Sequence, residues 1–216
     1  MIALHSQELI IFTPPKCATH SLHCALEHLD GAELVFGECP LQGIKGGWHT
    51  VEIPEPLLHY RRAAAIRHPV DRVISLWFHY CRYSEPAGVM SLPEFLSILI
   101  EDRAALIPFF CRRLDQILPR PLDHWLRFER LTQDLCSLGI EPPRLPRLER
   151  STSRGAWAGY FAALGLPMRR RLVSWLAPEA QRFHCYHLPD PGDLSGLHQQ
   201  LSSSTGCRHL TAPGSA

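Results

Sequence analysis

A single lysine near the start of the chain stands in a setting that favours an anion. The stretch "ELIIFTPPKCATHSL" runs from an apolar segment through two prolines to Lys16, and small or polar residues lead into a segment with helical spacing. The first N–H groups of a helix have no partner within it, and its dipole is positive at that end, so an anion is stabilised there. The pattern GxxxxGK followed by Ser or Thr, typical of nucleoside triphosphate-binding loops, is absent. The stretch predicts an anion site of another kind, although an isolated loop lysine is more often only solvated.

A second segment, "AIRHPVDRVISLWFHY", carries groups that suit a phosphate. Arg67 ends a short apolar run, and Ser75 lies in the helical pattern that follows. The rigid fork of an arginine matches phosphate oxygens, and a serine hydroxyl adds a donor. Structural alternatives stay open: Arg67 can pair with Asp71 or Glu129, and Ser75 can bond to its own helix backbone.

The elements that must position these residues alternate between strands and helices, which predicts an α/β fold with a parallel sheet and helices on both faces. Ligands bind beyond the carboxyl ends of strands in such sheets, where the Lys16 loop and the segment after Arg67 both lie. A capping box is expected at Ser91 and Glu94. The expected strands are Glu8–Thr13, Ala32–Phe36, Ala63–Pro69 and one starting at His124 that runs into a helix by Leu131, and the other expected helices are about Thr19–Leu29, Val70–Tyr83, Ser91–Arg103 and Pro167–Trp175.

Taken together and in this order, the two segments resemble the PAPS-dependent sulfotransferases, particularly the carbohydrate-type and related bacterial members. "TPPKCATHSL" is similar to their 5′-phosphosulfate loop, Pro-Lys-x-Gly-(Ser/Thr)-(Ser/Thr)-Ser-Leu, and "IRHPVDRVIS" to their 3′-phosphate segment, Arg-x-Pro-x-x-Arg-x-x-Ser. "WLRFERLTQDL" resembles their later Phe-Glu-x-Leu element. The resemblance covers Leu9 to Leu135 well and the C-terminal third only faintly. Ala18 stands where glycine is commoner, and His20 where a hydroxyl residue is usual.

The resemblance implies a P-loop NTPase-like sulfotransferase fold, a parallel sheet flanked by helices. It also implies the co-substrate 3′-phosphoadenosine 5′-phosphosulfate (PAPS), with PAP as product and no metal. Lys16 would neutralise the 5′-phosphate as the sulfuryl group leaves, Arg67 and Ser75 would hold the 3′-phosphate, and Arg72 would brace the loop. The 5′-phosphate would be held by the backbone from Cys17 to Ser21 and by two hydroxyls; the loop residues concerned are Lys16, Cys17, Ala18, Thr19, His20 and Ser21.

Two residues are candidates for the base that takes the proton of the acceptor hydroxyl. "KGGWHTVEIPE" lies where family members often carry a histidine or glutamate, and it offers His49 and Glu52. His49 is preferred because imidazole titrates near neutral pH and because the segment matches the family's His-Thr pattern. An ordinary hydrogen-bonded loop histidine is the open alternative. The acceptor implied is a hydroxyl of a carbohydrate or small metabolite.

Bulk composition limits the classes of partner. With 216 residues, one sizeable core is expected, in a single domain over residues 1–188 followed by a flexible tail over 189–216. A net charge of +1 gives no field that would attract nucleic acid or an anionic membrane. No apolar run approaches the roughly 18 residues of a membrane span, and the start lacks the pattern of a signal peptide. The expectation is a soluble cytoplasmic protein of undetermined oligomeric state.

The cysteines and histidines allow one further alternative. The eight cysteines are scattered without CxxC, which favours free thiols. His20, Cys24 and His28 follow helical spacing and could hold zinc, but a clear fourth ligand is missing.

Two rival functions remain. One is a degenerate sulfotransferase fold that binds a nucleotide or a partner without chemistry. The other is a nucleotide kinase, against which the missing Gly-Lys-Ser/Thr pattern speaks.

Overall fold

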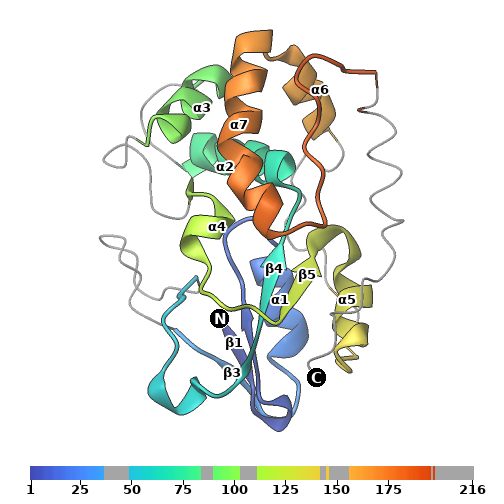
Figure 1. Cartoon of the computed structure of the whole chain (residues 1–216). Coiled ribbons are helices and arrows are strands. Elements are labelled where there is room, and N and C mark those ends of the chain that lie inside the picture. Colours follow the sequence, from blue (N-terminus) through green and yellow to red (C-terminus); the bar gives the residue numbers. More distant parts are fainter. Residues whose placement is uncertain are drawn as a thin grey trace.

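The computed structural model (Figure 1) describes residues 1–36, 49–83, 90–102, 111–141, 145, 156–195 and 197. Within these residues, one five-stranded sheet has the strand order β3-β1-β2-β4-β5. Its strands are β1 (Ile2–Leu4), β2 (Leu9–Phe12), β3 (Ala32–Leu34), β4 (Arg61–Ile66) and β5 (His124–Arg127).

The predicted α/β class, a sheet flanked by helices, is confirmed, but the sheet is mixed and not parallel as predicted. β2 pairs parallel with β4, and β4 pairs parallel with β5, but β1 is antiparallel to both β2 and β3. Only a short 3-10 turn, His5–Gln7, and one further residue join β1 to β2. A connection this short can close a hairpin but cannot make the crossover that a parallel pair requires.

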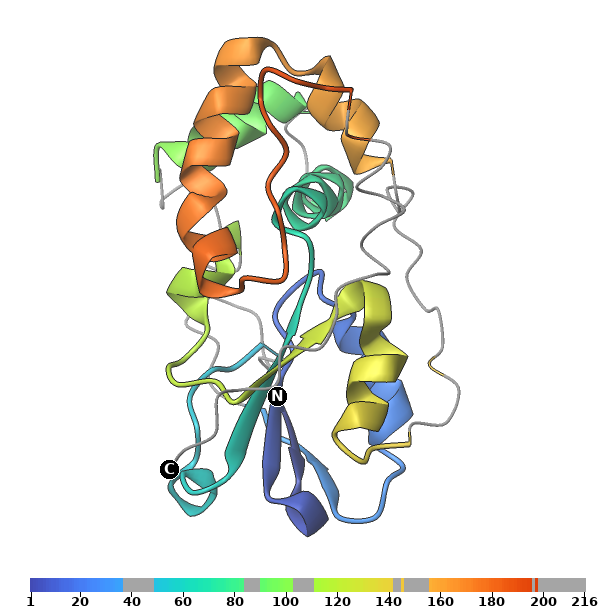
Figure 2. The ribbon, with the colours of Figure 1, turned by 45° about the vertical axis from the view of Figure 1, so that its right-hand side comes forward.

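The described helices flank the sheet and form a second layer beyond its carboxyl ends. Figure 2 shows α1 and α5 on one side of the sheet, while α2, α3, α6 and α7 gather above the ends of β2 and β4. The helices are α1 (Thr19–Leu26), α2 (Pro69–Tyr83), α3 (Leu92–Ile100), α4 (Leu114–Ile117), α5 (Leu131–Ser137), α6 (Trp157–Ala163) and α7 (Leu166–Arg182).

Several predicted boundaries needed correction. α1 and β3 end earlier than expected, and β4 starts two residues and ends three residues before its predicted bounds. β4 stops before Pro69, which has no N–H to donate to the sheet, and Pro69 starts α2, where the missing N–H costs nothing. α7 extends past the predicted end at Trp175 and includes Pro178. Leu176 and Glu179, both buried, anchor its last turns on either side of that proline.

Two groups of buried apolar side chains stabilise these layers. One surrounds the sheet and includes Phe12 and Leu126. The other lies among α2, α3, α6 and α7 and includes Phe95 and Phe161, which are fully buried. Burying a side chain of this size contributes about 1.5–3 kcal/mol. The helical layer therefore has a stabilising apolar core that is separate from the core around the sheet.

The start of α3 agrees with its sequence signal. The Ser91 hydroxyl accepts from the Glu94 amide, and the Glu94 carboxylate accepts from the Ser91 amide. The predicted capping box is therefore confirmed.

The region of the predicted tail lies largely outside the described residues. In the part that is described, Leu194 and Leu197 contact the apolar core of the helical layer. None of the described helices is both long enough and apolar enough to cross a membrane.

Candidate anion-binding loop and histidine site

The connection between β2 and α1 has a backbone that can enclose an anion. Lys16 and Ala18 both have left-handed backbones, with φ of 64° and 63°, and Cys17 lies between them. The Cys17 amide closes a turn by donating to the Pro14 carbonyl over 3.2 Å. Alternation of this kind points successive N–H groups into a concave nest that binds anions. Ala18 is also the N-cap of α1, so the nest continues into the positive end of that helix.

Two buried arginines hold the loop from beneath. Arg67 Nη1 donates to the Lys16 carbonyl over 3.1 Å, and Arg72 Nε donates to the Pro15 carbonyl over 3.3 Å. Their exposed fractions are only 2% and 0%. Arg72 Nη1 also donates to the Arg112 carbonyl over 2.9 Å. The expected bracing role of Arg72 agrees with these contacts, and Arg67 takes the same role.

Arg67 also forms the ion pair that was one of its structural alternatives. Its Nε donates to the Asp71 carboxylate over 2.8 Å, and the Phe128 ring lies 4.4 Å from the guanidinium carbon. Ser75, its expected partner on a 3′-phosphate, is 1% exposed, and within the described part of the chain its hydroxyl has no hydrogen-bond partner. Both side chains are thus buried. A 3′-phosphate could reach them only if the residues packed over them moved aside.

The hydroxyls of Thr19 and Ser21 differ in whether they can donate a hydrogen bond to a bound phosphate. Thr19 donates its proton inward, to the Thr13 and Pro14 carbonyls at 3.1 Å. Its hydroxyl is therefore used by the loop itself, and a bound phosphate would depend on backbone N–H groups and on the half-buried Ser21. Burial raises the pKa of Cys17 to about 12, so this residue serves the loop as an apolar thiol. His20 is exposed at the rim.

His49 lies against the same loop. Its Nδ1–H donates to the Thr13 carbonyl over 2.7 Å, which fixes the tautomer and leaves the lone pair on Nε2. Burial is the main reason why the pKa of His49 falls to about 4; the positive charges of the N-terminal amino group, His20 and Arg72 act in the same direction, and the bond to Thr13 opposes them. The imidazole is therefore neutral at pH 7.

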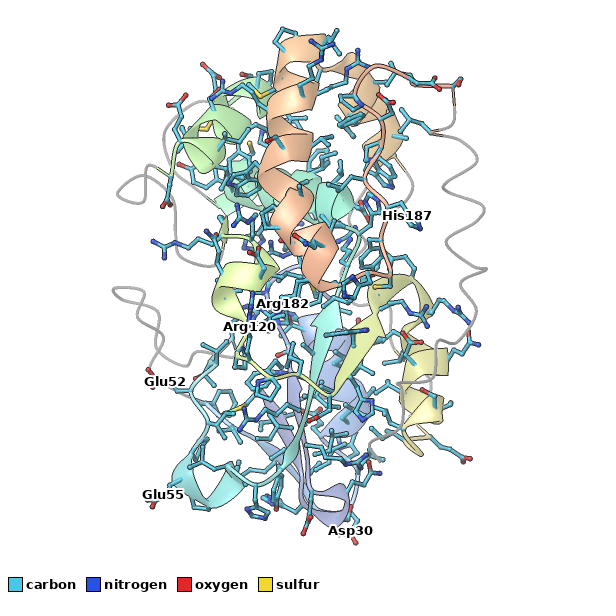
Figure 3. The ribbon with its side chains drawn as sticks, viewed as in Figure 1. Asp30, Glu52, Glu55, Arg120, Arg182 and His187 are labelled. Atoms are coloured by element: carbon cyan, nitrogen blue, oxygen red, sulfur yellow. The ribbon has the colours of Figure 1, made fainter. Side chains whose placement is uncertain are left out.

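Glu52, the other base candidate, is exposed and lies on the outside of its segment in Figure 3. Its amide donates to the Thr50 hydroxyl over 3.3 Å. Of the two candidates, only His49 has a recorded contact with the loop.

Sequence reasoning missed two buried titratable residues next to the loop. His23, on the inner face of α1, lies 3.2 Å from the Thr13 hydroxyl through Nε2, and burial lowers its pKa to about 4. Glu179 is 1% exposed, accepts from the Leu114 amide over 2.7 Å, and has its pKa raised to about 7 by burial, against the opposing charge of Arg72. Helical spacing from Leu172 and Leu176 was the signal that could have placed Glu179 inside.

Among the described residues Glu129 does not pair with Arg67, of which it was one of the two alternative partners. Its carboxylate accepts from the His68 amide over 3.1 Å and from the Tyr186 hydroxyl over 2.6 Å. It thereby ties the start of α2 to the chain that follows α7.

Metal ligands and disulfides are not features of the described residues. No group of three His, Cys, Asp or Glu side chains among them could hold a metal ion. Six cysteines lie in the described ranges, and all six are free thiols; Cys39 and Cys207 lie outside those ranges.

Glycine at position 18 is expected to stabilise the protein. An L-residue with a left-handed backbone costs roughly 1–2 kcal/mol, so Ala18→Gly should raise the free energy of unfolding by up to about 1 kcal/mol after the extra entropy of the unfolded chain is deducted. Ala162→Gly, at an exposed position of α6, should lower it by roughly 0.5–1 kcal/mol. Urea denaturation measures both, and equal signs for the two variants would contradict the left-handed loop.

The buried titratable groups predict opposing pH dependences. The folded pKa of His23, about 4, lies below the ordinary value of 6.5, so the unfolded chain binds the extra proton and stability falls as pH drops through this window. Glu179, at about 7 against 4.5, acts in reverse: the folded chain keeps the proton, and stability falls as pH rises from about 4.5 to 7.

Each group changes the pH slope of the unfolding free energy by up to about 1.4 kcal/mol per pH unit. Between pH 4.5 and 6.5, His23→Gln should make stability depend less steeply on pH, and Glu179→Gln should make it depend more steeply. Denaturation at several pH values distinguishes the two, and unchanged slopes would show that these groups are not buried as described.

Comparison of the chain with protein-family models, with curated proteins and with solved structures found no match.

Proposed function

We propose that this chain is a PAPS-dependent sulfotransferase with a P-loop-like fold, acting on a hydroxyl of a carbohydrate or small metabolite. The observation that carries the proposal is the contact between the two segments on which the sequence resemblance rests. Arg67 of the 3′-phosphate segment donates to the Lys16 carbonyl of the 5′-phosphosulfate loop across 51 positions of sequence. Sequence order alone does not require that contact, and two segments that bind one nucleotide must lie side by side.

The loop supplies what a departing nucleotide needs. When the acceptor oxygen bonds to sulfur, the bond from sulfur to the bridging oxygen breaks, and negative charge develops on the 5′-phosphate. In the proposed site, the Lys16 ammonium and the N–H groups at the start of α1 meet that charge. Preorganised donors of this kind are usually the largest source of catalysis, and the two arginines beneath the loop hold it in place.

His49 takes the acceptor proton in this proposal. Its Nδ1–H is fixed on the Thr13 carbonyl, so Nε2 is the basic atom. A pKa of about 4 gives the neutral form but a weak base. The negative charge of a bound donor raises that pKa, so His49 is a stronger base when the co-substrate is present.

One observation favours a second candidate, a nucleotide-binding protein without chemistry. Arg67 is held by Asp71, and both Arg67 and Ser75 are covered. A chain that had lost its 3′-phosphate site would retain the same anion loop.

PAPS turnover over a panel of sugar and phenol acceptors separates the two candidates. We expect PAP release that falls about 10²-fold or more in His49→Ala while PAP binding is kept. His28→Ala is the matched control, because that histidine side chain is 75% exposed, and it should leave turnover unchanged. PAP binding without turnover in the unmodified protein would favour the second candidate.

A further inference from the structure

Three side chains form a hydrogen-bonded chain at the end of the sheet opposite the Lys16 loop. His5 Nε2 lies 2.9 Å from the Glu33 carboxylate, and His5 Nδ1 lies 2.8 Å from the Tyr60 hydroxyl. His5 directly follows β1, Glu33 lies in β3, and Tyr60 directly precedes β4. In Figure 2 these elements meet at the foot of the molecule, far from the start of α1.

The position of the proton in each of these hydrogen bonds follows from the chemistry of the three side chains. An ionised carboxylate only accepts hydrogen bonds, so Nε2 of His5 carries the proton that is donated to Glu33. In that tautomer Nδ1 has the lone pair, and the Tyr60 hydroxyl must donate to it. The order carboxylate, imidazole and hydroxyl is the one that activates nucleophiles in hydrolases.

The hydrogen-bonded side chains of His5, Glu33 and Tyr60 are accessible to reagents in solution. The side chains of His5 and Glu33 are 40% and 58% exposed, and Tyr60 is half-buried. The His59 ring lies edge-on to Tyr60, with ring centroids 4.7 Å apart. Leu58, two residues before Tyr60, is 52% exposed, and an exposed leucine this near in the sequence favours a reagent that carries an aromatic or aliphatic group.

We propose that Tyr60 is a nucleophile and a covalent modification site, with His5 as its base and Glu33 as the residue that orients His5. The donor is an activated sulfonyl or acyl compound with an apolar group. The phenol oxygen bonds to the electrophilic sulfur or carbon, the bond to the leaving group breaks, and the leaving group departs with the electron pair. The phenol proton passes to Nδ1 of His5, and Glu33 stabilises the imidazolium. This site is independent of the proposed sulfotransferase function.

An aryl sulfonyl fluoride tests the proposal directly, because reaction joins the phenol oxygen to sulfur and releases fluoride. Tyr160 is the internal reference: it is also half-buried, and its recorded contacts within the described residues are with the Trp77 and Phe78 rings. Peptide mass spectrometry over time should show Tyr60 labelled at least about tenfold faster than Tyr160, less than the 10²–10⁴-fold of enclosed bases because water surrounds the pair.

Variants then assign the roles. His5→Gln should bring the Tyr60 rate down to that of Tyr160. Glu33→Ala should lower it several-fold, and Glu33→Gln, which keeps an acceptor oxygen but not the charge, should give an intermediate rate. The Tyr160 rate in each variant reports whether the fold is intact.

Equal labelling of Tyr60 and Tyr160 in the unmodified protein would overturn the proposal without reference to any variant. A Tyr60 rate that His5→Gln leaves unchanged would also overturn it, since the three side chains would then serve only to join β1, β3 and the segment before β4.

Discussion

Lys16→Ala is expected to lower PAPS turnover by about 10²–10³-fold, the size of effect seen when one preorganised donor to a developing anion is removed. Lys16 lies in a loop with left-handed backbones at positions 16 and 18, so its ammonium adds a full charge to the N–H groups of the proposed nest. PAP affinity should fall by a smaller factor than turnover, because charge builds up on the 5′-phosphate mainly as the sulfuryl group departs. Alanine also has a Cβ, so the strain of the left-handed backbone stays the same.

The chain offers a matched control for that variant. The sequence has one other lysine, Lys45, and Lys45→Ala removes the same charge from the chain. We expect it to keep turnover and PAP affinity within about twofold. Steady-state kinetics measures the turnover of both variants, and calorimetry measures their PAP affinity. Equal losses in the two, or none in Lys16→Ala, would show that charge at position 16 does no chemistry.

Arg72→Met is expected to be the most destabilising single change near the loop, at about 3–5 kcal/mol. Arg72 is fully buried and donates to the Pro15 and Arg112 carbonyls. Methionine fills much of the volume but leaves both carbonyls without that donor. It also removes the charge that favours ionised Glu179. Arg72→Lys should recover little, because an ammonium lacks the planar fork that reaches two acceptors at once.

Two further variants separate the causes of that loss. Arg82→Met, at an exposed position of the same helix, should change the unfolding free energy by no more than about 0.5 kcal/mol. Glu179→Gln combined with Arg72→Met should cost less than the sum of the single changes, because the uncompensated buried carboxylate is gone. Denaturant unfolding measures the cycle. A loss below about 1 kcal/mol for Arg72→Met would contradict the arginine support of the loop.

Local signals carried much of the fold. Two strand–loop–helix units, β2 to α1 and β4 to α2, follow from an apolar run, a proline break and helical spacing within about twenty residues each. A short sequence pattern of the same kind predicted the capping box of α3. These are the units that hold Lys16 and Arg67, which is why the centre of the candidate site was visible in the sequence.

Other features depend on tertiary packing and had no local signal. β1 has only three residues, too few to show a periodicity, and its reversal made the sheet mixed. The inward hydroxyl of Thr19 and the ion pair of Arg67 with Asp71 are choices among several partners that only the folded chain decides. His23 is a buried polar group that the pattern of apolar residues does not predict, whereas Glu179 continues the helical spacing of Leu172 and Leu176.

The most direct test of the proposed function is calorimetric titration of the purified protein with PAP and, in parallel, with AMP. The two ligands share adenosine and a 5′-phosphate, so the difference between their affinities isolates the 3′-phosphate. We predict that PAP binds at least about tenfold more tightly than AMP, a difference of about 1.4 kcal/mol, because Arg67 and Ser75 become exposed and bind the extra phosphate. Equal affinities, or no binding of PAP to the folded protein, would contradict a PAPS site.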